Sequence, residues 1–231
     1  MASNRPPDPG ADAGTTQTTP GREQIPAPPV DLDERDLPLT TLAERGLTLY
    51  RCHRIDRPYS PVAFNHEPIP DRFNAPNGEC GVLYLASDPF SAFIETFGAS
   101  MVTAALELRL VSESDLTRRC LCRIEVAVDP GTVRLVNLAD GYGLSRLGVD
   151  GRISTTKQRH VTRQWALALW RHPQRPDGLL YRACHDPERL SVVLYDRVGD
   201  ILRSTCEHNN LRDPHQLAAI LDHYAIGLDP D

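Results

Sequence analysis

The sequence lacks the short motifs of the commonest nucleotide-binding and metalloprotease mechanisms. It contains no G-x-x-x-x-G-K-[ST] loop, no G-x-G-x-x-G after a predicted strand and no H-E-x-x-H. No uninterrupted apolar run reaches transmembrane length, and 40% hydrophobic with 24% charged residues is typical of a soluble globular protein. Residues 1–30 lack the basic start and continuous apolar core of a secretory signal, so a cytoplasmic location is expected.

Cysteine is present, but not in a pattern that predicts a metal site or a disulfide framework. The six cysteines include no C-x-x-C pair, so reduced thiols are expected. Cys120 and Cys122 would share one face of a strand, where buried apolar packing is the usual role. No metal is expected either, because the nearest group of ligand types matches no zinc spacing: Cys52, His53, His66 and Cys80.

Acidic residues outnumber basic ones, which bears on the partners of the protein. The formal net charge is -6, and no lysine-rich block or aromatic-basic stripe is present. Direct binding of nucleic acid is therefore not expected, because contact with its backbone depends on clustered cations. No membrane partner is expected, and the sequence leaves the oligomeric state open, a homo-oligomer included.

Proline is concentrated near the N-terminus. Eight of the 20 prolines fall within residues 1–38, among Gly, Thr, Asp and Gln and few large apolar side chains. Such a segment buries too little apolar surface to offset its ordering entropy. Residues 1–40 are therefore predicted to be a disordered leader, and residues 41–231 a single domain, because that length suits one core.

The clearest junction of two elements lies at Asp88-Pro89. This pair is a helix N-cap followed by proline at the first helical position, and it directly follows the apolar run 81–86, which has strand character. Gly98 is expected to end the helix. Four apolar residues at i, i+3, i+4 and i+7 predict that it packs on the core: Phe90, Phe93, Ile94 and Phe97.

The remaining patterns favour an α+β fold. Thr41 and Glu44 have capping-box spacing before Gly46, and five prolines predict a long loop over residues 54–81. Strands dominate the middle of the chain without regular βαβ alternation, which favours α+β over a doubly wound sheet. Further strands are predicted at 47–53, 120–128, 132–138, 178–183 and 190–195, and further helices at 157–170 and from 213.

Four residues at the edges of elements are candidates for chemistry, and each has a structural alternative. Arg51 and Arg72 could recognise phosphate with a planar fork of donors, or could be ordinary surface arginines. Tyr84 could stack on a flat heterocycle, or could be a half-buried core residue. Glu95 points away from the phenylalanine stripe, as surface glutamates do.

Six segments of the chain resemble, in this order, the motifs of the RES domain family, the toxins of bacterial toxin–antitoxin pairs. The resemblance covers about residues 47 to 228. The segments are Leu49-Tyr50-Arg51, Asp71-Arg72-Phe73-Asn74-Ala75-Pro76, Gly81-Val82-Leu83-Tyr84-Leu85-Ala86, Glu95-Thr96-Phe97, 177–188 and Val193-Leu194-Tyr195-Asp196.

The resemblance implies an ADP-ribosyltransferase-like fold, with a mixed sheet core and flanking helices. It implies an enzyme that degrades NAD by hydrolysis or phosphorolysis of the nicotinamide-ribose bond. NAD would be the substrate, no cofactor would be needed, and an Xre-type antitoxin protein would be the partner. Carried over by motif, Arg51 and Arg72 would contact the phosphates, Tyr84 would line the nicotinamide side, and Glu95 would be the essential acid.

One position departs from the family motif. The family serine aligns with Ala183, so the predicted substrate-binding set lacks a hydroxyl. Cys184 should face the other side of its strand, and Ser87, Ser154 and Thr155 are other candidates for the role. Two alternative functions therefore stay open. One is a catalytically weakened or silent homologue that binds a nucleotide or a protein, and the other is an ADP-ribosyltransferase that modifies a macromolecule.

Overall fold

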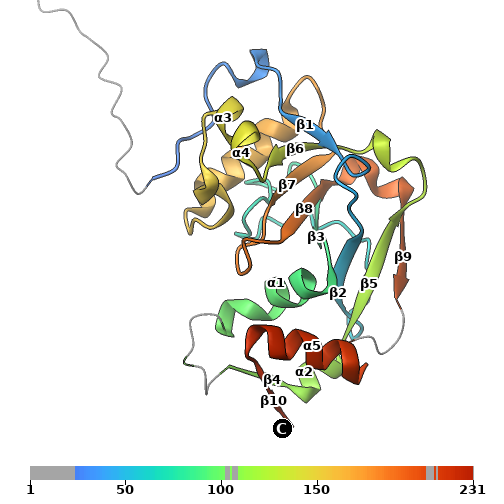
Figure 1. Cartoon of the computed structure of the whole chain (residues 1–231). Coiled ribbons are helices and arrows are strands. Elements are labelled where there is room, and N and C mark those ends of the chain that lie inside the picture. The colour runs from blue at the N-terminus through green and yellow to red at the C-terminus, as the bar shows by residue number, and fades with distance from the viewer. Residues whose placement is uncertain (1–23, 102–104, 106–108, 207–210, 212, 231) are drawn as a thin grey trace, which may run out of the picture.

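A computed structural model describes residues 24–101, 105, 109–206, 211 and 213–230 of the chain, and the expected α+β class is confirmed there (Figure 1). No described helix has the length and apolar character needed to cross a membrane. The strands are β1 Leu39–Thr41, β2 Leu49–Arg54, β3 Val82–Ala86, β4 Leu110–Ser112, β5 Arg119–Val126, β6 Arg134–Leu138, β7 Gly178–Arg182, β8 Leu190–Tyr195, β9 Leu202–Cys206 and β10 Gly227–Asp229. The α-helices are α1 Pro89–Met101, α2 Glu113–Thr117, α3 Gly141–Leu147, α4 Arg159–Arg171 and α5 Pro214–Tyr224, and 3-10 helices occur at η1 Leu32–Glu34, η3 Pro130–Thr132, η4 Gly151–Ser154 and η5 Asp196–Ile201.

A mixed sheet contains eight of the strands, in the order β1-β6-β7-β8-β3-β2-β5-β9, and β10 pairs with β4 in a second sheet. Within the large sheet β6 and β7 run parallel, and the other neighbours are antiparallel. Neighbours β2 and β3 share a single register pair, Tyr50 with Ala86, although each pairs along most of its length with its other neighbour. The sheet is therefore split between β2 and β3.

The two halves of the split sheet share one core. Leu83, Leu180 and Leu194 from one half are buried in the same cluster as Leu49 and Ile124 from the other. The cluster draws its buried residues from strands, turns and η5, and none of its described members lies on an α-helix. The sheet therefore bends around on itself to remove these side chains from water.

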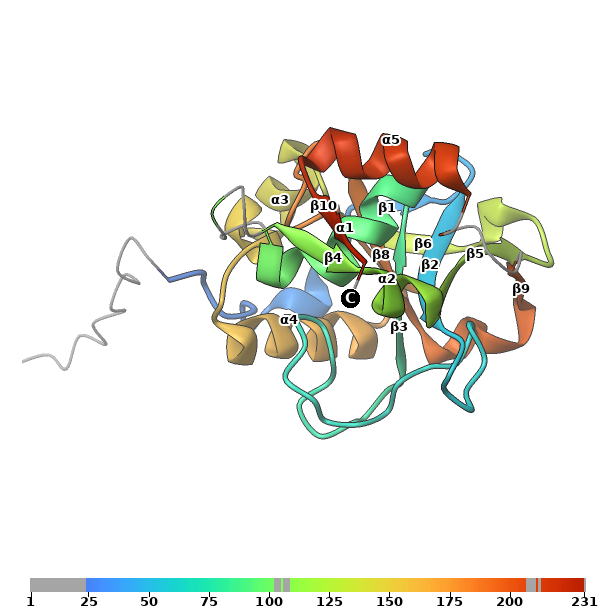
Figure 2. The same ribbon diagram turned by 90° about the horizontal axis from the view of Figure 1, so that it is seen from below.

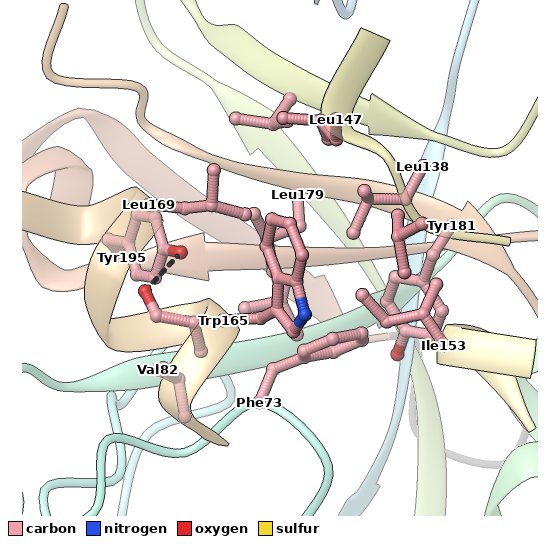
Figure 3. Close-up of a cluster of buried hydrophobic side chains, with 14 of the residues drawn as sticks. Phe73, Val82, Leu138, Leu147, Ile153, Trp165, Leu169, Leu179, Tyr181 and Tyr195 are labelled. Carbon is pink, nitrogen blue, oxygen red and sulfur yellow. Dashed lines mark hydrogen bonds between the residues drawn. The ribbon is translucent and has the colours of Figure 1, made fainter. Parts of the chain in front are cut away.

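The opposite face of β7, β8 and β3 packs against α4. Trp165 and Leu169 of α4 are fully buried in one cluster with Leu179 of β7 and Tyr195 of β8 (Figure 3). The Tyr195 hydroxyl donates to the Ala166 carbonyl at 3.1 Å, so the buried phenol is satisfied by the helix backbone. This layer holds α4 against the sheet.

Helices α1 and α5 form a separate layer, and Figures 1 and 2 both show them side by side. Phe93 and Ile94 of α1 are buried in one cluster with Ile220 of α5, Leu121 of β5 and Ala86 of β3. The predicted apolar stripe of α1 is therefore confirmed as its packing face. Because the cluster draws on β3 and β5, α1 rests on both halves of the sheet.

Local helix signals are confirmed, with one exception. Asp88 caps α1 by accepting from the Ser91 backbone N–H at 3.0 Å, and Asp213 caps α5 by accepting from His215 N–H at 3.0 Å. Gly98 does not end α1, which continues to Met101. A β-carbon at Gly98 would lie 3.1 Å from His185 Cγ, so glycine allows the chain after β7 to approach the helix.

Residues 24–40 are not the disordered leader that their proline content predicts. β1 extends the sheet by pairing with β6, and the Trp165 indole N–H donates to the Pro26 carbonyl at 2.8 Å. The composition gave the wrong prediction because a few apolar side chains are enough to order a segment when they pack into a core that the rest of the chain forms. Residues 1–23 lie outside the described residues. The buried residues of the segment are Ile25, Leu32, Leu37, Pro38 and Thr40.

Cys122 and Cys206 form a disulfide between β5 and the edge strand β9, so the expectation of reduced thiols is wrong for this pair. The two residues are direct register partners with Cα atoms 4.2 Å apart. Their separation of 84 residues hides this proximity from the sequence. Cys120 and Cys122 lie on one face of β5, as predicted, with sulfurs 3.4 Å apart.

The packing of residues 24–40 can be tested by comparing two apolar side chains of that segment. Leu32→Ala should lower the free energy of unfolding by about 2–5 kcal/mol, because Leu32 is 2% exposed in the core. Val30→Ala, at a residue 107% exposed, should change it by less than about 0.5 kcal/mol. Chemical denaturation measures both, and equal effects would contradict the packing.

Candidate functional site

A cleft of about 620 Å³ adjoins the split between β2 and β3. It lies within the size range of small-molecule sites, roughly 300–1,000 Å³. All four residues singled out in the sequence line it: Arg51 of β2, Arg72 of the long loop, Tyr84 of β3 and Glu95 of α1. Tyr50, Asp71, Tyr181 and His185 also line the cleft and lie in the motif segments, although the sequence gave them no role. Lys157, Arg159 and Ser191 line it from outside those segments.

Arg72 is placed at the cleft by the two loop residues that follow it. Phe73 is fully buried, and its ring packs edge-on against Tyr181 with centroids 4.9 Å apart. The Phe73 backbone N–H donates to the Tyr84 hydroxyl at 2.7 Å, and that hydroxyl donates to Asn74 Oδ1 at 3.0 Å. Tyr84 therefore lines the cleft and also anchors the loop that carries Arg72.

Arg72 is 7% exposed, and its hydrogen bonds go to neutral acceptors. It donates to the Ile153 and Thr156 carbonyls at 3.4 and 2.9 Å and to Cys184 Sγ at 3.3 Å. Burial lowers the pKa of Arg72, and the nearby cation Arg159 lowers it further. The guanidinium nevertheless stays charged at neutral pH, because arginine pKa values begin so high.

Arg51 has a similar environment on the other side of the split. It donates to the Pro61 and Ala63 carbonyls at 2.6 and 3.3 Å, which ties the long loop to β2. Burial lowers the pKa of Arg51 as well. Within the described residues, neither Arg51 nor Arg72 is in ion-pair contact with a carboxylate.

Unpaired buried cations of this kind are uncommon, because removing a charge from water costs several kcal/mol in the absence of a partner. Two further cations line the same cleft: Arg159, and Lys157, the only lysine in the sequence. These four cations outnumber the acidic lining residues Asp71 and Glu95, so the cleft wall carries an excess of positive charge that an anionic ligand would neutralise.

Glu95 is oriented by the turn that follows β7. Its Oε1 accepts from the His185 backbone N–H at 2.9 Å. Arg189 holds the same turn against the start of α1, because it bridges Asp88 and Asp186 at 2.8 and 2.7 Å. The carboxylate is thus positioned by a hydrogen bond from the backbone and a network of ion pairs, while it borders the open cleft.

Ala183 does not reach the cleft, contrary to its expected place in the substrate-binding set. It is fully buried, it is not a lining residue, and its N–H donates to the Arg189 carbonyl at 3.0 Å. Cys184, expected to face away, lines the cleft and contacts Arg72. The alternation fails because β7 ends at Arg182, so strand geometry no longer sets the direction of Cys184.

Of the hydroxyl residues considered from the sequence, only Thr155 lines the cleft. Ser87 accepts from the Leu190 backbone N–H at 3.3 Å, and Ser154 is buried away from the cleft wall. Ser191 of β8 lines the cleft and was not a candidate. A serine in the middle of an apolar strand has no local pattern that identifies it, so only tertiary contacts could reveal its place.

The anchoring role of Tyr84 can be tested by removing its hydroxyl. Tyr84→Phe should lower the free energy of unfolding by about 1–3 kcal/mol, because it leaves the Phe73 N–H and Asn74 Oδ1 without their partner. Tyr142→Phe is the matched control, because Tyr142 is 69% exposed and should show no change. Denaturant titration measures both, and an unaffected Tyr84 variant would refute the anchor.

Comparison with known proteins agrees with this geometry. No curated protein sequence matches the chain. A chain of the solved M. tuberculosis MbcT–MbcA toxin–antitoxin complex is similar in fold, with a TM-score of 0.53 and 16% identity, covering 74% of this chain and 89% of that chain. The mixed sheet core is thus of the expected ADP-ribosyltransferase-like kind. The RES domain family model matches residues 48–216, well over half of the sequence, and the chain therefore belongs to the RES domain family.

Proposed function

We propose that this RES protein is a toxin that degrades NAD by breaking the bond between nicotinamide and ribose. The observation that carries the proposal is that the buried Arg72 and the half-buried Arg51, neither in ion-pair contact with a carboxylate of the described chain, share one cleft with the carboxylate of Glu95. NAD has the complementary groups, a diphosphate and a ribose with a cationic leaving group. In this proposal NAD is the substrate, and no resident cofactor takes part.

The carboxylate of Glu95 suits the charge that develops in this reaction. When the bond between ribose C1′ and the pyridinium nitrogen breaks, its electron pair goes to the nitrogen, so nicotinamide leaves neutral and needs no acid. The ribose gains oxocarbenium character, which a nearby carboxylate stabilises. Water then attacks C1′ and loses a proton to give ADP-ribose, or inorganic phosphate attacks C1′ to give the 1-phosphate of ADP-ribose.

The arginines would act on the diphosphate, away from the reacting carbon. Arg72 and Arg51 are already immobilised by carbonyl groups, so little conformational freedom would be lost when they meet the substrate. Binding energy from the diphosphate would then position C1′ beside Glu95. Tyr84 would contribute both as a wall of the cleft and through the loop that it anchors.

We further propose an Xre-type antitoxin as the protein partner, because a cell that makes an NAD-degrading enzyme must restrain it. The similarity to a chain of a toxin–antitoxin complex supports an antitoxin partner in general. An adjacent gene for a small helix-turn-helix protein would support the Xre type.

The role of Glu95 can be tested in cells and with purified protein. Glu95→Gln should lower NAD consumption by about 100- to 1,000-fold and abolish growth arrest, because it removes the charge that stabilises the ribose cation. Glu125→Gln is the matched control, because its side chain is 52% exposed on β5. Enzymatic NAD assay after brief induction, with product analysis by mass spectrometry, gives the readout.

Three other outcomes of this experiment would each change the proposed function or the role of Glu95. NAD loss that persists in Glu95→Gln would exclude Glu95 as the essential acid. Unchanged NAD with wild type would favour a silent binding homologue. ADP-ribose attached to a macromolecule, in place of free ADP-ribose or its 1-phosphate, would identify a transferase.

The position at which the NAD diphosphate binds can be tested by chemical labelling of Lys157. This residue is exposed and is the only lysine in the sequence. Saturating NAD should slow acylation of its amine several-fold in the Glu95→Gln variant, which would not consume the ligand. Nicotinamide riboside, which lacks the diphosphate, should give little protection. Peptide mass spectrometry measures the labelling rate, and equal protection by both ligands would place the diphosphate elsewhere.

A further inference from the structure

Ser191 of β8 is a buried hydroxyl that borders the cleft without a partner. The residue is 1% exposed and lines the cleft, and its Oγ makes no hydrogen bond within the part of the chain that the structure describes. A buried hydroxyl in this state destabilises a fold relative to alanine, because its hydration is lost without replacement. Such a group is well placed to bond to a ligand in place of the protein.

The sheet places Ser191 among residues of the candidate site. Its register partners are Tyr181 on β7 and Ala86 on β3, so the three side chains project from the same face. Tyr181 also lines the cleft, and Figure 3 shows its ring beside Phe73, which follows Arg72.

The pKa of Tyr181 is affected by the residues that surround it in the cleft. Burial raises the pKa of Tyr181 well above its usual value, with Tyr84 and Glu95 adding to the rise, and Arg72 and then Ser191 opposing it. Tyr181 and Ser191 are neighbours because they are register partners, and the Ser191 Oγ does not meet the geometry of a hydrogen bond within the described chain. Both residues line the cleft together with Glu95.

We propose that the Ser191 hydroxyl binds a hydroxyl group of the substrate ribose beside Glu95, and so takes the part for which Ala183 has no hydroxyl. A serine hydroxyl both donates and accepts, which matches a ribose hydroxyl with either orientation of the proton. This inference rests on the proposed function, because it assumes that the ribose of NAD lies beside Glu95.

Ser154 provides a matched control for the test. It too is 1% exposed with an unpartnered Oγ, but it does not line the cleft. Ser191→Ala should lower kcat/KM for NAD about tenfold, the loss expected for one neutral hydrogen bond to the substrate, without lowering the melting temperature. Ser154→Ala should leave kcat/KM unchanged. Adding Ala183→Ser to Ser191→Ala should not restore activity, because Ala183 does not reach the cleft.

The outcomes separate this inference from the proposed function. Activity of Ser191→Ala equal to that of Ser154→Ala, with an active wild type, would overturn the inference and leave the proposed function standing. A fall in melting temperature that accounts for the lost activity would also overturn it, because the role would then be structural. Recovery of activity when Ala183→Ser is added would show that the hydroxyl that binds the substrate acts from position 183, which would also overturn the inference. A wild type that neither consumes NAD nor is protected by it at Lys157 would overturn both proposals.

Discussion

The cleft depends on the place where β2 and β3 stop pairing. Beyond the pair Tyr50 and Ala86 the two neighbours diverge, because each half of the sheet turns one face toward the core that both halves share. Leu83 and Ile124 are buried in one cluster to which no described α-helix contributes, so the two halves of the sheet must curve toward each other to cover it. The split therefore follows from hydrophobic burial, and it opens a cleft bordered by strands, the long loop and α1.

Charged and polar side chains bridge this split and bring the site together. Arg51 on β2 donates to carbonyls of the long loop, and Tyr84 on β3 holds the same loop at Phe73. Glu95 is held by the turn after β7. Arg51, Tyr84 and Glu95 thus each have a structural contact that immobilises them before substrate arrives, which is the preorganisation that positions a reacting carbon.

Residues of the site also make unfavourable contributions to the free energy of folding, and packing elsewhere must offset them. The buried Arg72 and the half-buried Arg51 donate to neutral acceptors, and the Ser191 hydroxyl has no partner in the described chain. Local departures from good burial of polar groups are common at functional sites, where a ligand supplies the missing interactions. The fully buried layer around Trp165 and Tyr195 provides the compensating stability.

Short-range patterns were enough to predict the helix that begins after Asp88 and the strand at 190–195, because capping and alternation involve neighbours in the chain. The four motif residues that line the cleft were assigned roles by their resemblance to the RES family motifs, since residue patterns alone left each of them a structural alternative. Three features needed long-range contacts: the packing of residues 24–40 on α4 and the sheet, the Cys122–Cys206 disulfide across 84 residues, and the place of Ser191 beside Tyr181. No local signal could reveal them. Burial and proximity depend on where distant segments meet, and that is settled by the free energy of packing the whole core.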